Sequence, residues 1–232
     1  MSLADVVGHA GGAVLAAVFG LIARLRGTRA LHPVGVCGAA RLDVRTGPPS
    51  GVPVLDGPGP HRGVARWSRA TGRRGDGLDI EGLALRIDGP TGGDVLLAST
   101  GTGVVGRHVL VLRRRDTHGP LTTLLPLSTR RGRLLLRLDP VEADPVEADP
   151  RGWAAGAHPP TSYRLLVSAP GRPWHERGTL ELTWTEGDCT RRHDPVGRPP
   201  AGTWVAPLWA ALRDPSYAAS EQVAADPVTP AG

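Results

Sequence analysis

The sequence Gly178-Thr179-Leu180-Glu181-Leu182-Thr183-Trp184 alternates apolar and polar side chains over the length of one strand. Successive side chains of a β-strand point to opposite faces, so this alternation indicates a strand with one buried face and one solvated face. Leu136-Arg137-Leu138 shows the same pattern in a shorter form. The sequence therefore predicts half-buried β-sheet.

Comparable segments recur along the chain, and turn signals such as Asp88-Gly89-Pro90 separate them. The spacing leaves no place for the helical crossovers of a parallel sheet, which favours a closed barrel or a sandwich. We expect eight strands, at residues 34–44, 63–68, 82–87, 94–99, 121–127, 134–138, 163–167 and 178–184, with 107–112 as a candidate for one more.

The length of 232 residues suits one large all-β barrel or two small domains, and the 32 glycines and 23 prolines favour short strands over long helices. All 27 basic residues are arginine, and lysine and asparagine are absent, a bias that we attribute to codon usage before function. The net charge of +5 suits an anionic partner, but the arginines form short clusters without interleaved aromatic residues. We expect solvated arginines and no nucleic-acid partner.

An apolar run, Ala13–Ala23, precedes the expected strands and is followed by Arg24, Arg26 and Arg29. The run has about half of the roughly 20 residues that a membrane span needs, and no positively charged leader precedes it. We predict an amphipathic or docking helix within residues 1–28 of a cytoplasmic protein, and we leave open a peripheral membrane contact through residues 13–29. The tail at 223–232 is expected to be disordered.

Two further features have more than one interpretation. Cys37 and Cys189 lack metal-ligand spacing, and whether they pair stays open, with a reducing cytoplasm as the default. Residues 140–144 repeat as residues 145–149 and carry carboxylates. No glycine supplies the bend of a cation-binding loop, so we expect a duplicated, solvated loop.

Four short motifs follow one another in a fixed order. They are Arg29-Ala30-Leu31-His32-Pro33-Val34-Gly35, Val64-Ala65-Arg66-Trp67-Ser68, Asp79–Ile87 and Arg213–Glu221. In this order, over residues 29–221, they resemble segments of the haem catalases. In that family an Arg lies three residues before the distal His, an R-F-S strand follows, and the proximal helix carries the pattern R-x-F-x-Y. The chain looks like a minimal, divergent member of the catalase-like superfamily.

The resemblance implies a fold dominated by β-structure. We expect an eight-stranded antiparallel catalase-like β-barrel, which with the proximal helix covers residues 29–222. It is accompanied by the N-terminal helix and a short C-terminal helix. A b-type haem is the implied cofactor, and hydrogen peroxide or an organic hydroperoxide is the implied substrate. A homo-oligomer is left open.

The resemblance also assigns site residues on the two faces of the haem. Tyr217 would be the proximal iron ligand, with Arg213 as the partner of its phenolate. On the distal side, His32 would be the acid–base group, with the Ser68 hydroxyl orienting its ring. Two further arginines, Arg29 and Arg66, would bind the haem propionates through forked hydrogen bonds.

The residue types suit these roles. Haem iron accepts a phenolate oxygen as axial ligand, and an Arg four residues before the Tyr lies on the same helix face. A histidine base can move the proton between the two oxygens of a peroxide. A plainer interpretation also stands, because Asp214-Pro215 is a typical helix start, which would make Tyr217 an ordinary first-turn residue.

The chain departs from the catalase pattern in ways that affect the chemistry. Glu81 replaces an Arg of the third motif, and residues 98–100 stand where catalases carry a distal Asn, so Ser99 or Thr100 would have to donate instead. Arg66 could also form a structural salt bridge with Asp79 or Glu81. A loosely walled haem favours slow peroxidase chemistry. The alternative is a barrel that has lost haem and binds another small ligand.

Six other histidines share no motif, and we assign no chemistry to them. They are His61, His108, His118, His158, His175 and His193. The chain has no G-x-S-x-G, P-loop or metal-hydrolase spacing, so hydrolase and nucleotide chemistry have no support.

Overall fold

The computed structural model describes residues 35–70, 77–114, 117–141, 159–185 and 193–204. All of them belong to one compact unit that extends over residues 32–204. The expected N-terminal helix within residues 1–28, the short C-terminal helix and the tail at 223–232 lie outside the described residues.

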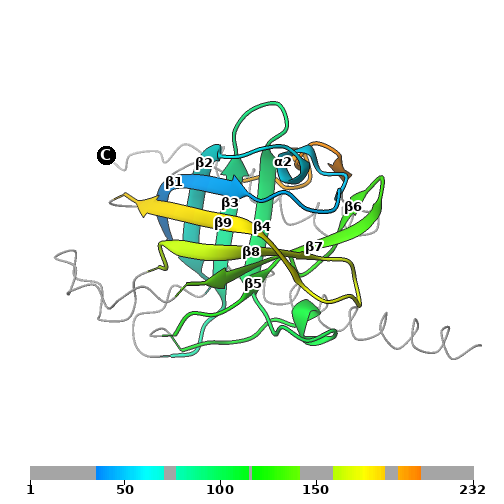
Figure 1. Cartoon of the computed structure of the whole chain (residues 1–232). Coiled ribbons are helices and arrows are strands. Elements are labelled where there is room, and N and C mark those ends of the chain that lie inside the picture. The colour runs from blue at the N-terminus through cyan, green and yellow to red at the C-terminus, as the bar shows by residue number, and fades with distance from the viewer. Residues whose placement is uncertain (1–34, 71–76, 115–116, 142–158, 186–192, 205–232) are drawn as a thin grey trace, which may run out of the picture. The chain divides into compact units, whose positions relative to one another are not determined.

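Ten antiparallel strands make up the described sheet, and eight of them close into a barrel (Figure 1). Around the barrel the order is β1, β2, β3, β4, β5, β7, β8 and β9, and the ring closes where β9 pairs with β1. The short strands β6 and β10 extend the sheet beside β7. The expected eight-stranded antiparallel barrel is therefore confirmed. The strands are β1 (Gly35–Val44), β2 (His61–Arg69), β3 (Glu81–Ile87), β4 (Gly93–Ser99), β5 (Leu121–Thr122), β6 (Leu127–Thr129), β7 (Gly132–Pro140), β8 (Ser162–Ser168), β9 (His175–Trp184) and β10 (Thr203–Trp204).

Two expected strands differ from the structure. The segment 121–127 is divided between β5 and β6, because Leu124 has a left-handed φ of 58° that interrupts the extended backbone. The candidate strand at 107–112 instead begins in a 3₁₀-helix, η1 (Gly106–His108). There the buried Arg107 donates hydrogen bonds to the carbonyls of Gly103 and Arg172, which holds this segment as a loop.

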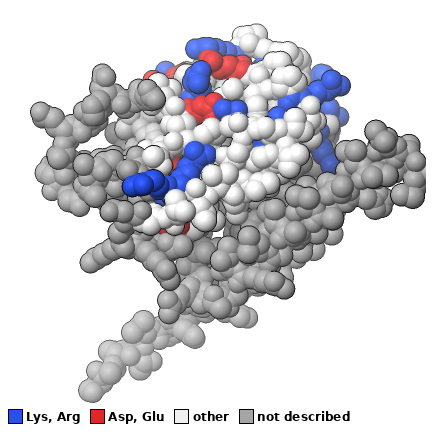
Figure 2. All heavy atoms as spheres, turned by 90° about the horizontal axis from the view of Figure 1, so that it is seen from below, with Lys and Arg blue, Asp and Glu red and all other residues white. Residues whose placement is uncertain are grey.

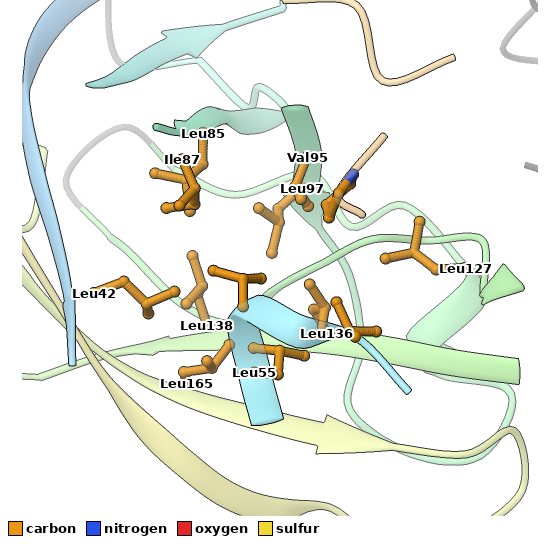
Figure 3. A pocket seen from close by; sticks show the side chains of 13 residues that line it. Leu42, Leu55, Leu85, Ile87, Val95, Leu97, Leu127, Leu136, Leu138 and Leu165 are labelled. Carbon is orange, nitrogen blue, oxygen red and sulfur yellow. The ribbon is translucent and has the colours of Figure 1, made fainter. Parts of the chain in front are cut away.

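The barrel interior is filled by aliphatic side chains from every second position of its strands. Leu83, Leu97, Leu138 and Leu180 are each at most 4% exposed. A short helix, α2 (Pro53–Asp56), closes one end, where Leu55 joins the core (Figure 3). Proline at its first turn suits the helix start.

The buried Arg177 of β9 fastens this end of the barrel. Its guanidinium donates to the carbonyl oxygen of Leu55 at 2.9 and 3.2 Å and to the Asp56 carboxylate at 3.2 Å. Asp56 also accepts hydrogen bonds from the backbone of Ser50 and Gly51. The helix is thus held by charge-assisted bonds in addition to packing.

The charged surface agrees with the clusters expected from the sequence. Figure 2 shows one face of the molecule, on which the arginines of the described residues form separate groups with acidic side chains among some of them. The described residues form no continuous basic surface on this face. Two of the ion pairs are Arg41–Asp43 and Arg45–Glu176. Exposed pairs of this kind contribute little to stability.

We expect Leu83→Ala to lower the free energy of unfolding by about 2–5 kcal/mol, because it removes a fully buried side chain from a closely packed interior. Leu78→Ala is the matched control, since Leu78 is 60% exposed, and its effect should stay within about 0.5 kcal/mol. Urea unfolding of both variants measures the difference. Equal effects of the two substitutions would contradict the inward assignment of Leu83.

Candidate functional site

Of the six site residues expected from the sequence, Arg66 and Ser68 are described, and both lie on the outer face of β2. Their neighbours Ala65 and Trp67 belong to the core, so the alternation of the strand points Arg66 and Ser68 away from the interior. Ser68 is nevertheless only 5% exposed. The other four, Arg29, His32, Arg213 and Tyr217, lie outside the described residues.

The strand register places Ser68 in a line of small residues that crosses four strands. Gly35 of β1 pairs with Ser68, Ser68 pairs with Gly82 of β3, and Gly82 pairs with Ala98 of β4. We call these four residues the outer row. No side chain in the outer row is larger than that of serine, and Gly35, Ser68 and Gly82 are buried.

The Arg66 guanidinium lies over the Gly35 end of the outer row. A Cβ atom built on Gly35 would approach the Arg66 guanidinium carbon to 2.8 Å and the Trp67 carbonyl oxygen to 2.6 Å. A side chain at position 35 is therefore excluded, and the space over that backbone is taken by the Arg66 guanidinium. The structure thus brings Arg66 and Ser68 together at the start of β1.

The two candidates for replacing the missing distal Asn lie in different hydrogen-bond networks. Ser99 faces the interior, where its hydroxyl accepts from the Glu81 backbone N–H at 3.1 Å and donates to the Val111 carbonyl oxygen at 2.8 Å. The Thr100 hydroxyl lies 3.0 Å from the Thr122 hydroxyl. Since neighbouring strand residues face opposite ways, Ala98 and not Ser99 shares the face of Ser68.

A second polar group lies inside the barrel, at the end opposite α2. Glu81, the first residue of β3, is fully buried, and its Oε1 accepts hydrogen bonds from Trp67 Nε1 at 2.7 Å and from His118 Nδ1 at 2.8 Å. The alternative salt bridge between Arg66 and Glu81 is wrong, because the two side chains leave opposite faces of the barrel wall.

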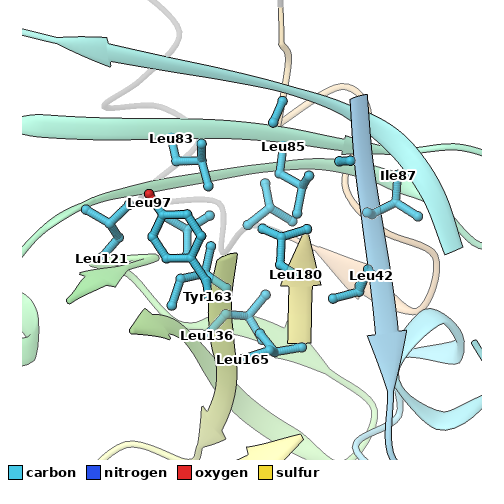
Figure 4. Packing of buried hydrophobic residues seen from close by; sticks show 14 of the residues in the cluster. Leu42, Leu83, Leu85, Ile87, Leu97, Leu121, Leu136, Tyr163, Leu165 and Leu180 are labelled. Carbon is cyan, nitrogen blue, oxygen red and sulfur yellow. The ribbon is translucent and has the colours of Figure 1, made fainter. Parts of the chain in front are cut away.

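Tyr163 and Arg113 complete this group, which we call the mouth cluster: Trp67, Glu81, Arg113, His118 and Tyr163. The Tyr163 hydroxyl points toward the part of the interior that holds Leu83 and Leu121 (Figure 4). Arg113 Nη2 donates to the carbonyl oxygens of Thr100 at 2.9 Å and Pro120 at 3.1 Å.

Burial and neighbouring charge change the acidity of the mouth cluster. Burial raises the pKa of Tyr163 well above its ordinary value, and the negative charge of Glu81 raises it further, while Arg69 opposes both. Burial also lowers the pKa of the Arg113 guanidinium, which the charge of Glu81 partly offsets. Tyr163 therefore stays a neutral hydrogen-bond donor.

Four polar atoms of the mouth cluster are buried without a hydrogen-bond partner. Within the described structure these are Glu81 Oε2, Arg113 Nε, His118 Nε2 and Tyr163 Oη. A buried polar atom that stays unsatisfied costs about 1–3 kcal/mol, so folded proteins keep few of them. Their concentration at one end of the barrel makes the mouth cluster the candidate site of the interior.

No chemistry was expected of His118, because it lies in a loop and shares no motif with the other histidines; it is 37 residues away from Glu81 in the sequence. One signal was available. Glu81 shares the inward-facing positions of β3 with Leu83 and Leu85. A carboxylate at an apolar position requires partners from other segments, although the sequence does not say which.

The cavity that the described residues enclose near α2 has no room for a haem. An apolar cavity of about 30 Å³ lies near α2 (Figure 3). A cavity of about 150 Å³ is needed to hold one benzene, so a porphyrin is excluded there. The cavity near α2 is lined by Leu42, Val52, Val54, Leu55, Leu85, Ile87, Val95, Leu97, Leu127, Leu136, Leu138, Leu165 and Pro200.

Three other expectations bear on the site. Cys37 is disulfide-bonded, and Cys189 is the only other cysteine of the chain. Disulfides persist mainly in oxidising compartments, so this bond does not favour the expected cytoplasmic location, which stays a prediction.

Within the described ranges, no group of three or more His, Cys, Asp or Glu side chains could hold a metal ion. No helix in the same ranges combines the length and the apolar character of a membrane span.

Comparison with known proteins adds no family. No protein-family model and no curated protein matches the chain. The catalase resemblance therefore stays an interpretation of the motifs.

We expect the stability of the protein to fall at alkaline pH partly because of Tyr163. Its pKa is raised in the folded state, so its contribution is complete below about pH 10 and is lost as the pH rises through that value, where the unfolded chain releases a proton that the folded chain keeps. Tyr163→Phe should therefore lose less stability than the wild type between about pH 8 and about pH 11. Urea unfolding at the two pH values tests this. An identical alkaline loss in both proteins would rule out a raised pKa.

Proposed function

We propose that this chain is a haem-dependent oxidoreductase that acts on hydrogen peroxide or organic hydroperoxides, with the haem against the outer row of the barrel. The observation that carries the proposal is the outer row itself, in which Gly35, Ser68, Gly82 and Ala98 form a strip of small side chains across four strands with Arg66 beside it.

The outer row suits a flat macrocycle better than the interior does. Side chains no larger than serine let a planar group approach the backbone closely, whereas the interior cavity holds only about 30 Å³. The Arg66 guanidinium at one edge offers the forked donor geometry that binds a carboxylate such as a haem propionate. The Ser68 hydroxyl is the polar side chain of the row.

The resemblance to the catalases supplies the remaining roles. Tyr217 would ligate the iron, Arg213 would stabilise the phenolate, and Arg29 would bind the second propionate. When bound, the haem supplies the iron that activates the peroxide bond.

His32 is the proposed distal acid–base group. It precedes Gly35 by three residues, so the chain keeps it within about 11 Å of the outer row. Its imidazole would carry the proton from one peroxide oxygen to the other, and the Ser68 hydroxyl would hold the ring.

A barrel that has lost haem is the second candidate, and one observation favours it. Glu81 stands where the catalase motif has an Arg. Inside the barrel, its carboxylate accepts hydrogen bonds from Trp67 and His118. The chain thus carries a buried carboxylate at the position where the catalase motif has an Arg. This candidate predicts colourless protein even when haem precursor is supplied.

We expect haem-supplied wild-type protein to show a Soret band, and Tyr217→Phe to shift or abolish it, because that variant removes the phenolate ligand. Tyr163→Phe is the matched control, since Tyr163 is buried inside the barrel and is the only other tyrosine. Absorbance spectra of the purified proteins decide. The haem assignment fails if the wild type takes up no haem, and the ligand assignment fails if Tyr217→Phe leaves the spectrum unchanged.

For the haem-loaded protein we expect His32→Ala to slow peroxide-dependent oxidation of a phenolic dye by about 10²–10⁴-fold, the usual contribution of a general acid–base group. His108→Ala is the control, because the His108 ring contacts the Leu124 carbonyl oxygen at 2.7 Å and His108 is not part of the outer row. Initial rates measure both variants. A loss in His108→Ala as large as that in His32→Ala would remove His32 from its proposed role.

A further inference from the structure

The mouth cluster is separate from the outer row. Trp67 and Glu81 face the interior, whereas Ser68 and Gly82, their neighbours on the same strands, belong to the outer row. The barrel wall therefore lies between the two groups, and a ligand of the mouth cluster does not depend on the haem.

The hydrogen bonds of the mouth cluster fix which of its atoms donate and which accept. The indole of Trp67 can only donate, so Glu81 Oε1 is its acceptor. His118 Nδ1 lies 2.8 Å from the same oxygen and must also donate. The proton of a neutral His118 ring is thus on Nδ1, and Nε2 carries a lone pair.

The four atoms without partners then divide into two acceptors and two donors. Glu81 Oε2 and His118 Nε2 accept, Arg113 Nε donates, and the Tyr163 hydroxyl, which can also accept, is available as the second donor. Glu81 and Tyr163 are fully buried. A molecule that satisfies all four needs polar hydrogens on one side and an oxygen with two lone pairs on the other.

The charges around the cluster select a neutral molecule. Glu81 is opposed by Arg113, and Arg69 lies over the Trp67 ring with its guanidinium carbon 5.0 Å from the ring centre. An anion would have to approach the buried carboxylate of Glu81, and a cation would have to approach the two guanidinium groups. Both approaches are unfavourable in a buried site.

Access is available at His118. Its side chain is 17% exposed, whereas that of Glu81 is 1% exposed. The imidazole packs edge-on against Trp67, with ring centres 6.1 Å apart and planes at 66°. Movement of this one ring would open the cluster to solvent, and Trp67 would report it.

We propose that the mouth cluster is a binding site for a small neutral molecule of the primary-amide class. The two amide hydrogens donate to Glu81 Oε2 and His118 Nε2, and the carbonyl oxygen accepts from Arg113 Nε and Tyr163 Oη. His118 is the side chain through which the molecule enters.

The test uses formamide as the probe and formate as its isosteric anion, with the full-length protein. NMR of the Trp67 indole N–H and of the His118 ring nitrogens follows the titration. We expect formamide to shift these signals saturably, with a millimolar dissociation constant because three heavy atoms limit the affinity. Formate should produce no saturable shift. The proposal is overturned if the two probes act alike, or if His118 carries its proton on Nε2.

Two variants sharpen the test. Tyr163→Phe removes one donor and should weaken formamide binding at least tenfold. In Glu81→Gln the oxygen stays with Trp67 and His118, so an NH₂ group replaces the Oε2 acceptor and opposes the amide hydrogens. That variant should therefore lose formamide and gain formate.

His108→Gln is the control for both variants, because it changes a histidine away from the cluster and should bind formamide as the wild type does. If Glu81→Gln does not fold, Tyr163→Phe alone decides. Unchanged formamide affinity in a folded Tyr163→Phe protein refutes the site. Neither outcome depends on haem binding, which the absorbance spectra test separately.

Discussion

Closure of the barrel by the pairing of β9 with β1 is the constraint on which the other features depend. A closed antiparallel barrel leaves no unpaired edge, and its register assigns every side chain to the inside or to the outside. One residue of displacement would exchange the two faces. The outer row and the mouth cluster, built from alternate residues of β2 and β3, exist together only because this register is fixed.

The two faces of the same wall offer different chemistry. Outside, small residues and the Arg66 guanidinium suit a flat group with carboxylates. Inside, a buried carboxylate is stabilised by Trp67 and His118 in an otherwise aliphatic interior. A charge in such a place is tolerated only because donors from β2 and from the loop before β5 reach it.

The expected barrel was predictable because strand alternation is a local property. The strands β8 and β9 appear where the pattern placed them. Predictions that needed side-chain direction or a partner from elsewhere were less successful. Ser99 faces inward, residues 107–112 are held as a loop by Arg107, and Glu81 pairs with a histidine to which the sequence analysis assigned no chemistry.

The sequence by itself determined half-buried β-strands and placed Arg66 and Ser68 on one strand face, since both follow from a period of two residues. The alternation left a barrel and a sandwich open, and the resemblance to the catalases favoured the barrel of eight strands. Only the tertiary structure decided that Gly35, Ser68, Gly82 and Ala98 form one row, because cross-strand register depends on pairing between distant segments. It alone also brought His118, Arg113 and Tyr163 to Glu81. The physical reason is that a buried charge is stabilised by the donors that lie near it in space. The separation of two residues along the sequence does not give their distance in space.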